Sequence, residues 1–210
     1  MRIISHRGYW YKSVEKNTVA AFERSFRLGF GTETDFRDSR GRLVISHDLP
    51  TVDALDAEAF FRLLAQYDRW LPLAINIKAD GLQDLLHLAL SRHGIENYFL
   101  FDMSVPDAVF SMKQGLRVFT RHSDVELQPA FYEKAAGVWM DAFEDDTWLT
   151  PEVIAIHLGA GKQVCIVSPE LHGRSHCALW ERLRAHPVHH NERLILCSDL
   201  PEEATAFFRK

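Results

Sequence analysis

Residues 73–94 read LAINIKADGLQDLLHLALSRHG. The first five, residues 73–77, are mostly apolar and include branched side chains, as is typical of a buried β-strand. Residues 80–93 then repeat leucine at helical spacing, at Leu82, Leu85, Leu86 and Leu90. Gly94 follows the last turn, where glycine commonly ends a helix. The stretch therefore predicts a strand followed directly by a helix.

The same strand-then-helix alternation runs through the whole chain. Eight short apolar runs predict the strands, at residues 3–5, 32–35, 73–77, 98–103, 116–120, 137–142, 163–167 and 193–197. Strands that alternate with helices pair in parallel, and eight such units close into a barrel. The predicted fold class is α/β, a (β/α)₈ TIM barrel forming a single domain over residues 1–210. A doubly wound sheet is the alternative, but it usually has a glycine-rich first turn, whereas residues 6–11 contain one glycine.

Two local signals add detail to this architecture. Asn17 belongs to a residue type that caps helices well, so the first helix is predicted to begin there. Arg40 and Gly41 predict a turn before the apolar residues 43–45, so an extra hairpin is expected after the second strand. This hairpin ends at His47.

Composition limits the classes of function. The 210 residues are 47% hydrophobic and 25% charged, the mixture expected of a globular chain. Lys and Arg number 24 against 29 Asp and Glu, a net charge of −5, so no nucleic-acid partner is expected. Three scattered cysteines predict reduced thiols and a cytoplasmic protein. No stretch approaches the ~20 apolar residues of a spanning helix, so no stable membrane insertion is expected.

Reactive side chains gather where the predicted strands end. In a (β/α)₈ barrel the carboxyl ends of the strands carry the functional residues. Glu33 and Asp35 are two apart on a strand, so their carboxylates point to the same side. Two anions held together force one to be neutral or take a cation between them, and oxygen ligands favour Mg²⁺ or Ca²⁺. A solvated strand end or a salt-bridged pair is the alternative for the carboxylates alone.

The neighbouring strand ends strengthen the functional interpretation. His6 and Arg7 end the first strand, and His47 ends the hairpin. Asn76 and Lys78 lie at the end of the third strand. A metal, a cationic clamp and two groups that titrate near neutrality suit phosphoryl transfer.

The ordered motifs resemble the glycerophosphodiester phosphodiesterase family. They are His6-Arg7-Gly8, Asn17-Thr18, residues 31–35 (GTETD), residues 41–48 (GRLVISHD), Ile77-Lys78 and residues 197–201 (CSDLP). The match is strong over residues 1–50 and thin between residues 80 and 190. The resemblance implies a (β/α)₈ barrel that hydrolyses a small phosphodiester with the help of a divalent cation.

The resemblance also implies a role for each matching residue. Glu33 and Asp35 would ligate the metal, and His6 and His47 would be the general acid and base. Arg7 would hold the phosphate, and Lys78 would assist it. Which histidine is the acid stays open, and the nucleophile is either a neighbouring glycerol hydroxyl or water.

Two residues depart from the family pattern. Asn76 stands where the family has an acidic metal ligand, and Lys16 stands where it has a glutamate. Both changes make the site more positive, so metal binding should be weaker than in the family. Asn76 can still ligate through its amide oxygen, so we expect a weak Mg²⁺ or Ca²⁺ site. The chain also lacks most of the family's insertion after Asp48, so a more open mouth is expected.

The sequence leaves two other functions open. Sphingomyelinase D is similar in placing His, Glu-x-Asp and His in this order, so a phospholipase D-like enzyme on the same scaffold is one alternative. A catalytically silent barrel that binds a phosphorylated ligand is the other, because Lys16 and Asn76 change the site. The leaving-group alcohol and the oligomeric state have no signature in the sequence.

Overall fold

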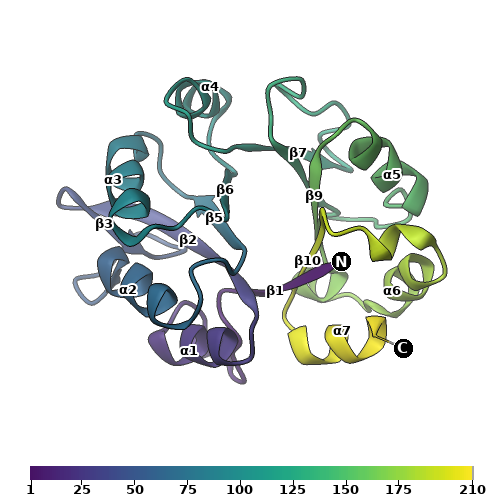
Figure 1. Ribbon diagram of the computed structural model, residues 1–210, viewed down its shortest axis with the longest axis horizontal. Coiled ribbons are helices and arrows are strands. Elements are labelled where there is room, and N and C mark those ends of the chain that lie inside the picture. The colour runs from purple at the N-terminus through teal and green to yellow at the C-terminus, as the bar shows by residue number, and fades with distance from the viewer. Residues whose placement is uncertain (210) are drawn as a thin grey trace. The chain divides into compact units, whose positions relative to one another are not determined.

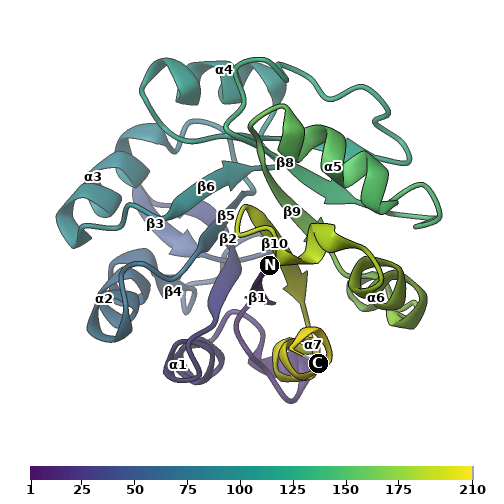
Figure 2. The same cartoon turned by 45° about the vertical axis from the view of Figure 1, so that its right-hand side comes forward.

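The computed structural model describes residues 1–209, which form two compact units (Figures 1 and 2). The N-terminal unit is Ser5–Val118, and the C-terminal unit joins Met1–Ile4 to the part of the chain from Phe119 onward. Strand β1 (Arg2–His6) therefore begins in one unit and ends in the other. None of the described helices is long and apolar enough to cross a bilayer.

The N-terminal unit is built on parallel strands with a hairpin attached. Strand β2 (Gly31–Ser39) pairs in parallel with β5 (Leu73–Ile77), and β5 pairs with β6 (Tyr98–Phe101). On its other side β2 pairs antiparallel with β3 (Arg42–Ile45), which pairs with the short β4 (Leu55–Asp56). The predicted extra hairpin is thus present. The unit's helices are η1 (Ser13–Glu15), α1 (Val19–Arg27), α2 (Ala57–Tyr67), α3 (Gln83–His93) and α4 (Val105–Lys113).

A cluster of phenylalanines joins the helices of this unit to its sheet. Phe22 and Phe26 of α1 contact Phe60 of α2 edge-to-face, and Phe60 contacts Phe36 of β2 in the same way. All four are buried. Each buried aromatic side chain stabilises the fold by about 1.5–3 kcal/mol. The cluster packs on the face of β2 that carries Phe36, and the opposite face of the strand carries Glu33 and Asp35.

Helix α1 begins one residue later than the sequence predicts. Its N-cap is Thr18, whose hydroxyl accepts a hydrogen bond from the backbone N–H of Ala21. Asn17 has a left-handed backbone (φ 60°), and its side chain bonds to Thr34 and Asp35 instead. The prediction that Asn17 caps the helix was therefore wrong, because the Asn17 side chain is hydrogen bonded to Thr34 and Asp35 and not to the helix.

The C-terminal unit contains four parallel strands in the order β10-β9-β8-β7. Their bounds are Phe119–Ser123 for β7, Gly137–Asp141 for β8, Gln163–Val167 for β9 and Leu194–Ser198 for β10. The helices are α5 (Pro151–Gly159), η2 (Pro169–His172), α6 (Cys177–Arg184), η3 (Pro187–His190) and α7 (Pro201–Phe208). Trp180 of α6 is 1% exposed and belongs to the apolar core that these helices and strands share.

One crossover departs from the predicted alternation. Residues 124–136, between β7 and β8, contain turns but no α-helix. Strand β7 also begins at Phe119, later than the predicted run 116–120. Leu116 and Val118 are buried, but Val118 makes only an isolated bridge to Leu100. These two apolar residues are therefore buried, but they do not belong to β7.

A group of hydrogen-bonded side chains links β7 to the helix-free crossover and to α5. His122 of β7 is hydrogen bonded through Nδ1 to Nε2 of His157 on α5, over 3.0 Å. The hydroxyl of Tyr132, from the helix-free crossover, lies 2.9 Å from Nδ1 of His157. Burial, and then the charge of His122, lowers the pKa of His157 to about 4. The His157 imidazole is therefore neutral at pH 7.

Stability should fall as His157 is forced to titrate. The unfolded chain protonates this histidine near pH 6.5, whereas the folded chain resists protonation down to about pH 4. The free energy of unfolding should therefore drop by about 1–2 kcal/mol between pH 6.5 and pH 5 from this group. Urea unfolding of the wild type and His157→Gln at both pH values measures the difference. The exposed-histidine variant His190→Gln should keep the wild-type pH dependence; if His157→Gln keeps it too, the assignment is wrong.

Candidate active site

Strand β2 supplies two buried carboxylates on one face. Glu33 is 2% exposed and Asp35 is 0% exposed. Alternation along the strand turns both to the same side, as predicted. Asp35 is in register with Asn76 of β5, so the amide of Asn76 comes from the neighbouring strand. All the site residues lie in the N-terminal unit.

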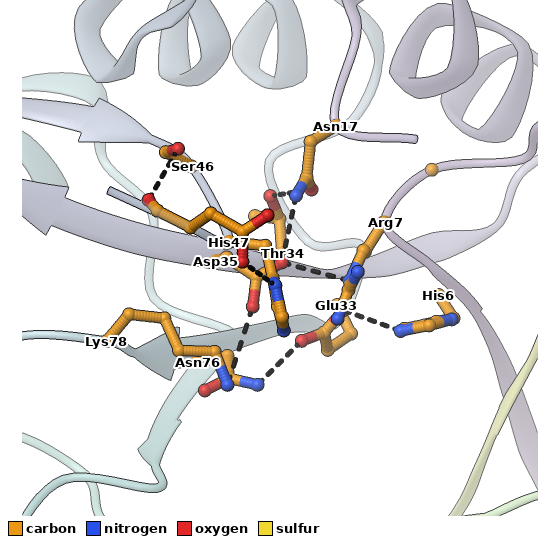
Figure 3. A network of polar contacts seen from close by, with 12 residues as sticks. His6, Arg7, Asn17, Glu33, Thr34, Asp35, Ser46, His47, Asn76 and Lys78 are labelled. Carbon is orange, nitrogen blue, oxygen red and sulfur yellow. Dashed lines mark hydrogen bonds and ion pairs between the residues drawn. The ribbon is translucent and has the colours of Figure 1, made fainter. Parts of the chain in front are cut away.

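Asp35 is held by three nitrogen groups (Figure 3). Arg7 Nε lies 3.0 Å from Oδ2, and the Asn17 amide donates to the same oxygen over 2.8 Å. Lys78 Nζ lies 3.6 Å from Oδ1 and also 3.6 Å from Oδ2 of Asp102. Asp35 is therefore the carboxylate toward which both Arg7 and Lys78 are turned.

Glu33 has a different environment from Asp35. Its Oε1 accepts a hydrogen bond from the Asn76 amide over 3.1 Å, and its Oε2 lies 4.0 Å from Nε2 of His6. Burial, followed by the charge of Asp35, raises the pKa of Glu33 to about 8. Glu33 therefore resists ionisation in this buried position. A cation beside Glu33 would reverse that resistance.

Three buried oxygens of this site are without hydrogen-bond partners within residues 1–209. They are Glu33 Oε2, Asp35 Oδ1 and Asn76 Oδ1. Buried oxygens without partners are rare in proteins, because desolvation without compensation costs about 1–3 kcal/mol each. Two carboxylates and an amide are suitable ligands for Mg²⁺ or Ca²⁺. The three residues predicted to hold a metal therefore fit one.

The third ligand position distinguishes this site from a fully acidic one. The described chain has no cluster of three or more His, Cys, Asp or Glu side chains arranged to hold a metal ion. Asn76 completes the set with a neutral oxygen, so the donor set holds fewer negative charges than three carboxylates would. The other departure, Lys16, places its ammonium 4.4 Å from the ring centroid of Trp10.

His47 lies at the rim of the site. Its backbone carbonyl accepts from the guanidinium of Arg37, and its Nδ1 is bonded to Asp48 over 2.9 Å. The side chain is 44% exposed. Ser46, just before it, donates its backbone N–H to the carbonyl of Asp35, which fixes the hairpin end to β2. Figure 3 shows the His47 ring in the same group of side chains as Asp35 and Asn76.

Left-handed backbone conformations are concentrated at the site. Arg7 (φ 57°), Asn17 (φ 60°) and Asp102 (φ 71°) all adopt this region, which non-glycine residues seldom occupy. Strain of this kind persists where the surrounding contacts over-determine it, and it is common at functional sites. Each of the three residues turns its side chain toward the Asp35–Lys78 ion pair or a member of it.

The structure adds two residues to which the sequence analysis assigned no role in the site. Asn17 donates to Asp35 while its Oδ1 accepts from the Thr34 hydroxyl over 2.8 Å. Asp102 follows β6 and pairs with Lys78. The signal for Asn17 was visible in the motif Asn17-Thr18 but was attributed to capping. Asp102 lies inside the apolar run 98–103, where its position at a strand end was the available signal.

Comparisons with known proteins agree on the architecture. No protein-family model matches the chain, and no curated protein matches it. Among solved structures, a glycerophosphodiester phosphodiesterase from Parabacteroides distasonis aligns with a TM-score of 0.74 at 16% identity, covering 99% of this chain and 96% of that one. One from Agrobacterium tumefaciens gives 0.70 at 17%, covering 98% and 99%. A Ca²⁺-dependent phosphatidylinositol-specific phospholipase C from Streptomyces antibioticus gives 0.56 at 11%, covering 99% and 96%.

These similarities confirm the predicted fold class. The chain has the (β/α)₈ barrel fold, matched over nearly its whole length by glycerophosphodiester phosphodiesterase structures. The structural similarity is to the same family that the sequence motifs resemble.

Proposed function

We propose that the protein is a metal-dependent phosphodiesterase that hydrolyses a glycerophosphodiester or a related glycerol-phosphate ester. The observation that carries the proposal is the set of three buried oxygens without hydrogen-bond partners among the described residues, on Glu33, Asp35 and Asn76, beside two cations and His6. The sequence motifs and the similarity to solved glycerophosphodiester phosphodiesterases support the substrate class.

The side chains divide the work of phosphodiester hydrolysis. Arg7 and Lys78 would bind the non-bridging oxygens of the phosphate, since both already face the Asp35 carboxylate as fixed cations. Glu33, Asp35 and Asn76 would hold the divalent cation. When bound, a divalent cation at these oxygens offsets the charge that develops on the phosphate in the transition state.

The two histidines would move the protons. One imidazole, neutral, removes the proton from the attacking hydroxyl, and the other, protonated, donates a proton to the leaving alkoxide oxygen. His6 is largely buried and 4.0 Å from Glu33, whereas His47 is partly exposed and bonded to Asp48.

A direct assay tests the proposal. The protein is incubated with glycerophosphocholine or a chromogenic phosphodiester in the presence of Mg²⁺, Mn²⁺ or Ca²⁺, and the released alcohol is measured. Turnover supports the proposal. Binding of the diester without turnover under all three cations would favour a silent, ligand-binding barrel instead.

Removal of the divalent cation should abolish turnover, and adding Mg²⁺ or Ca²⁺ back should restore it. Because Asn76 contributes a neutral ligand, half-maximal activity is expected only at about millimolar Mg²⁺ or Ca²⁺. Asn76→Asp adds a negative charge at the site and should lower that concentration about tenfold. Isothermal titration with the cation alone measures the same change without turnover. Full activity in excess EDTA would remove the metal from the mechanism.

We also propose a cytoplasmic location. Cys165, Cys177 and Cys197 are all free, which suits a reducing compartment.

A further inference from the structure

The ammonium group of Lys78 lies between two carboxylates of the N-terminal unit. Its Nζ is 3.6 Å from Oδ1 of Asp35 and 3.6 Å from Oδ2 of Asp102. Hydrogen bonds between an ammonium group and a carboxylate are usually about 2.7–2.9 Å long, so Lys78 has closed on neither carboxylate. The equal distances indicate that Asp35 and Asp102 share the ammonium group.

Three neighbouring strands bring these groups together. Asp35 belongs to β2, Lys78 directly follows β5, and Asp102 directly follows β6. The backbone N–H of Lys78 donates to the carbonyl of Phe36 over 3.0 Å, which ties the base of the lysine side chain to β2. The sheet therefore holds the backbone around the ammonium group, and the position of the flexible lysine side chain depends on the two carboxylates.

The sharing of Lys78 leaves one oxygen of Asp35 open. Asp35 is 0% exposed, and its Oδ1 has no hydrogen-bond partner among residues 1–209. Its Oδ2, in contrast, accepts from Asn17 and faces Arg7. A buried oxygen without a partner is costly, and an ammonium group this close would ordinarily supply the missing bond. Here Asp102 attracts the same ammonium group from the other side, and Oδ1 is one of the three oxygens proposed to hold the cation.

We infer that Asp102 is a positioning residue, which holds Lys78 away from Asp35 Oδ1 and so keeps that oxygen available to a divalent cation. The inference rests on the proposed function, because it concerns the same cation site. Asp102 acts here through Lys78 and not as a ligand. When Asp102 is neutral, the ammonium group closes on Oδ1, and a cation has to displace it. A carboxylate that acts only through its charge would instead favour the cation whether Lys78 is present or not.

Cation binding to the full chain tests this inference without any turnover. Mn²⁺ is titrated into the protein and the free ion is counted by electron paramagnetic resonance, since Mn²⁺ prefers oxygen ligands as Mg²⁺ does. Asp102→Asn removes the charge and keeps the side-chain shape, and asparagine tolerates the left-handed backbone of this position, φ 71°. Its dissociation constant for Mn²⁺ should rise about tenfold, because a hydrogen bond to a charged group has to be broken.

A double-mutant cycle with Lys78→Met separates positioning from a simple charge effect. In the Lys78→Met background, Asp102→Asn should raise the dissociation constant for Mn²⁺ by no more than about threefold, the effect of one nearby charge in water. A rise as large as that in the wild-type background would show that Asp102 acts without Lys78, and it would overturn the inference. Wild-type Mn²⁺ affinity in the single variant Asp102→Asn would overturn it as well.

Asp80→Asn is the matched control for the loss of charge. Asp80 lies two residues beyond Lys78, and its carboxylate accepts hydrogen bonds from the backbone and the hydroxyl of Ser104. Its loss should raise the dissociation constant by about threefold at most, and a rise equal to that of Asp102→Asn would contradict the inference. Thermal melting shows that each variant is folded.

The outcome for Asp102 is distinct from the outcome for the proposed function. If Asp102→Asn weakens Mn²⁺ binding only when Lys78 is present, and the wild type turns over no diester, the inference stands and the hydrolase function fails. If the wild type turns over a diester and Asp102→Asn keeps its Mn²⁺ affinity, the function stands and the inference fails. A wild type that binds no Mn²⁺ also refutes the inference.

Discussion

Replacing His6 by alanine is expected to lower kcat for a glycerophosphodiester by about 10²–10⁴-fold, the usual contribution of a positioned acid or base. The imidazole is 4.0 Å from the Glu33 carboxylate, beside the proposed metal ligands, where a proton donor or acceptor for the diester is needed. His47→Ala should cause a loss of the same order. Steady-state kinetics with a chromogenic phosphodiester under saturating Mg²⁺ measures both.

The control for these variants is His87→Ala. His87 is an exposed residue of α3 in the same unit, so its loss should leave kcat within twofold of the wild type. Wild-type kcat in either His6→Ala or His47→Ala would refute acid–base catalysis by that residue. Thermal melting of each variant shows whether a loss of rate is merely a loss of fold.

Replacing Gly8 by alanine is expected to destabilise the protein by about 2–5 kcal/mol, from overpacking and a left-handed backbone together. A Cβ at Gly8 would lie 2.7 Å from the Cβ of Ala21 and 2.8 Å from its carbonyl carbon, and the residue has φ 80°. The Gly8 backbone N–H also donates to Thr32 over 2.9 Å, so the backbone cannot shift without breaking that bond. Urea unfolding measures the change.

Gly29 provides the matched control for this prediction. It has nearly the same backbone conformation, φ 79°, but an added Cβ would meet nothing within 4 Å. Gly29→Ala should therefore lose only the backbone part, about 1–2 kcal/mol. If Gly8→Ala loses no more than Gly29→Ala, the close approach between Gly8 and helix α1 does not constrain the fold.

Much of the sheet could be predicted because its strands are buried. The predicted runs 73–77 and 163–167 coincide with β5 and β9, where nearly every residue is buried and turn residues follow. The prediction was weaker where apolar residues are buried without joining a strand, as at Leu116. The crossover 124–136 was wrongly predicted to contain a helix, since polar side chains replace the packing that periodicity would reveal.

The candidate site was predictable where the chain is regular. The shared orientation of Glu33 and Asp35 follows from strand geometry, and the structure buries both side chains on one face. The contacts of Asn17 and Asp102 depend on left-handed backbone conformations, which the residue type alone does not predict. Asp141, the last residue of β8, and His172, the last residue of η2, are 31 residues apart in the sequence, so no local pattern indicates their contact.

The connection between β7 and β8, residues 124–136, joins two parallel strands without a helix. Its path is tied by Thr120 to the carbonyl of Ala130, by Tyr132 to His157 and by Lys162 to the carbonyl of Ala135. With these three contacts in place, β7 and β8 remain paired in parallel along their whole register, although no helix covers the connection between them.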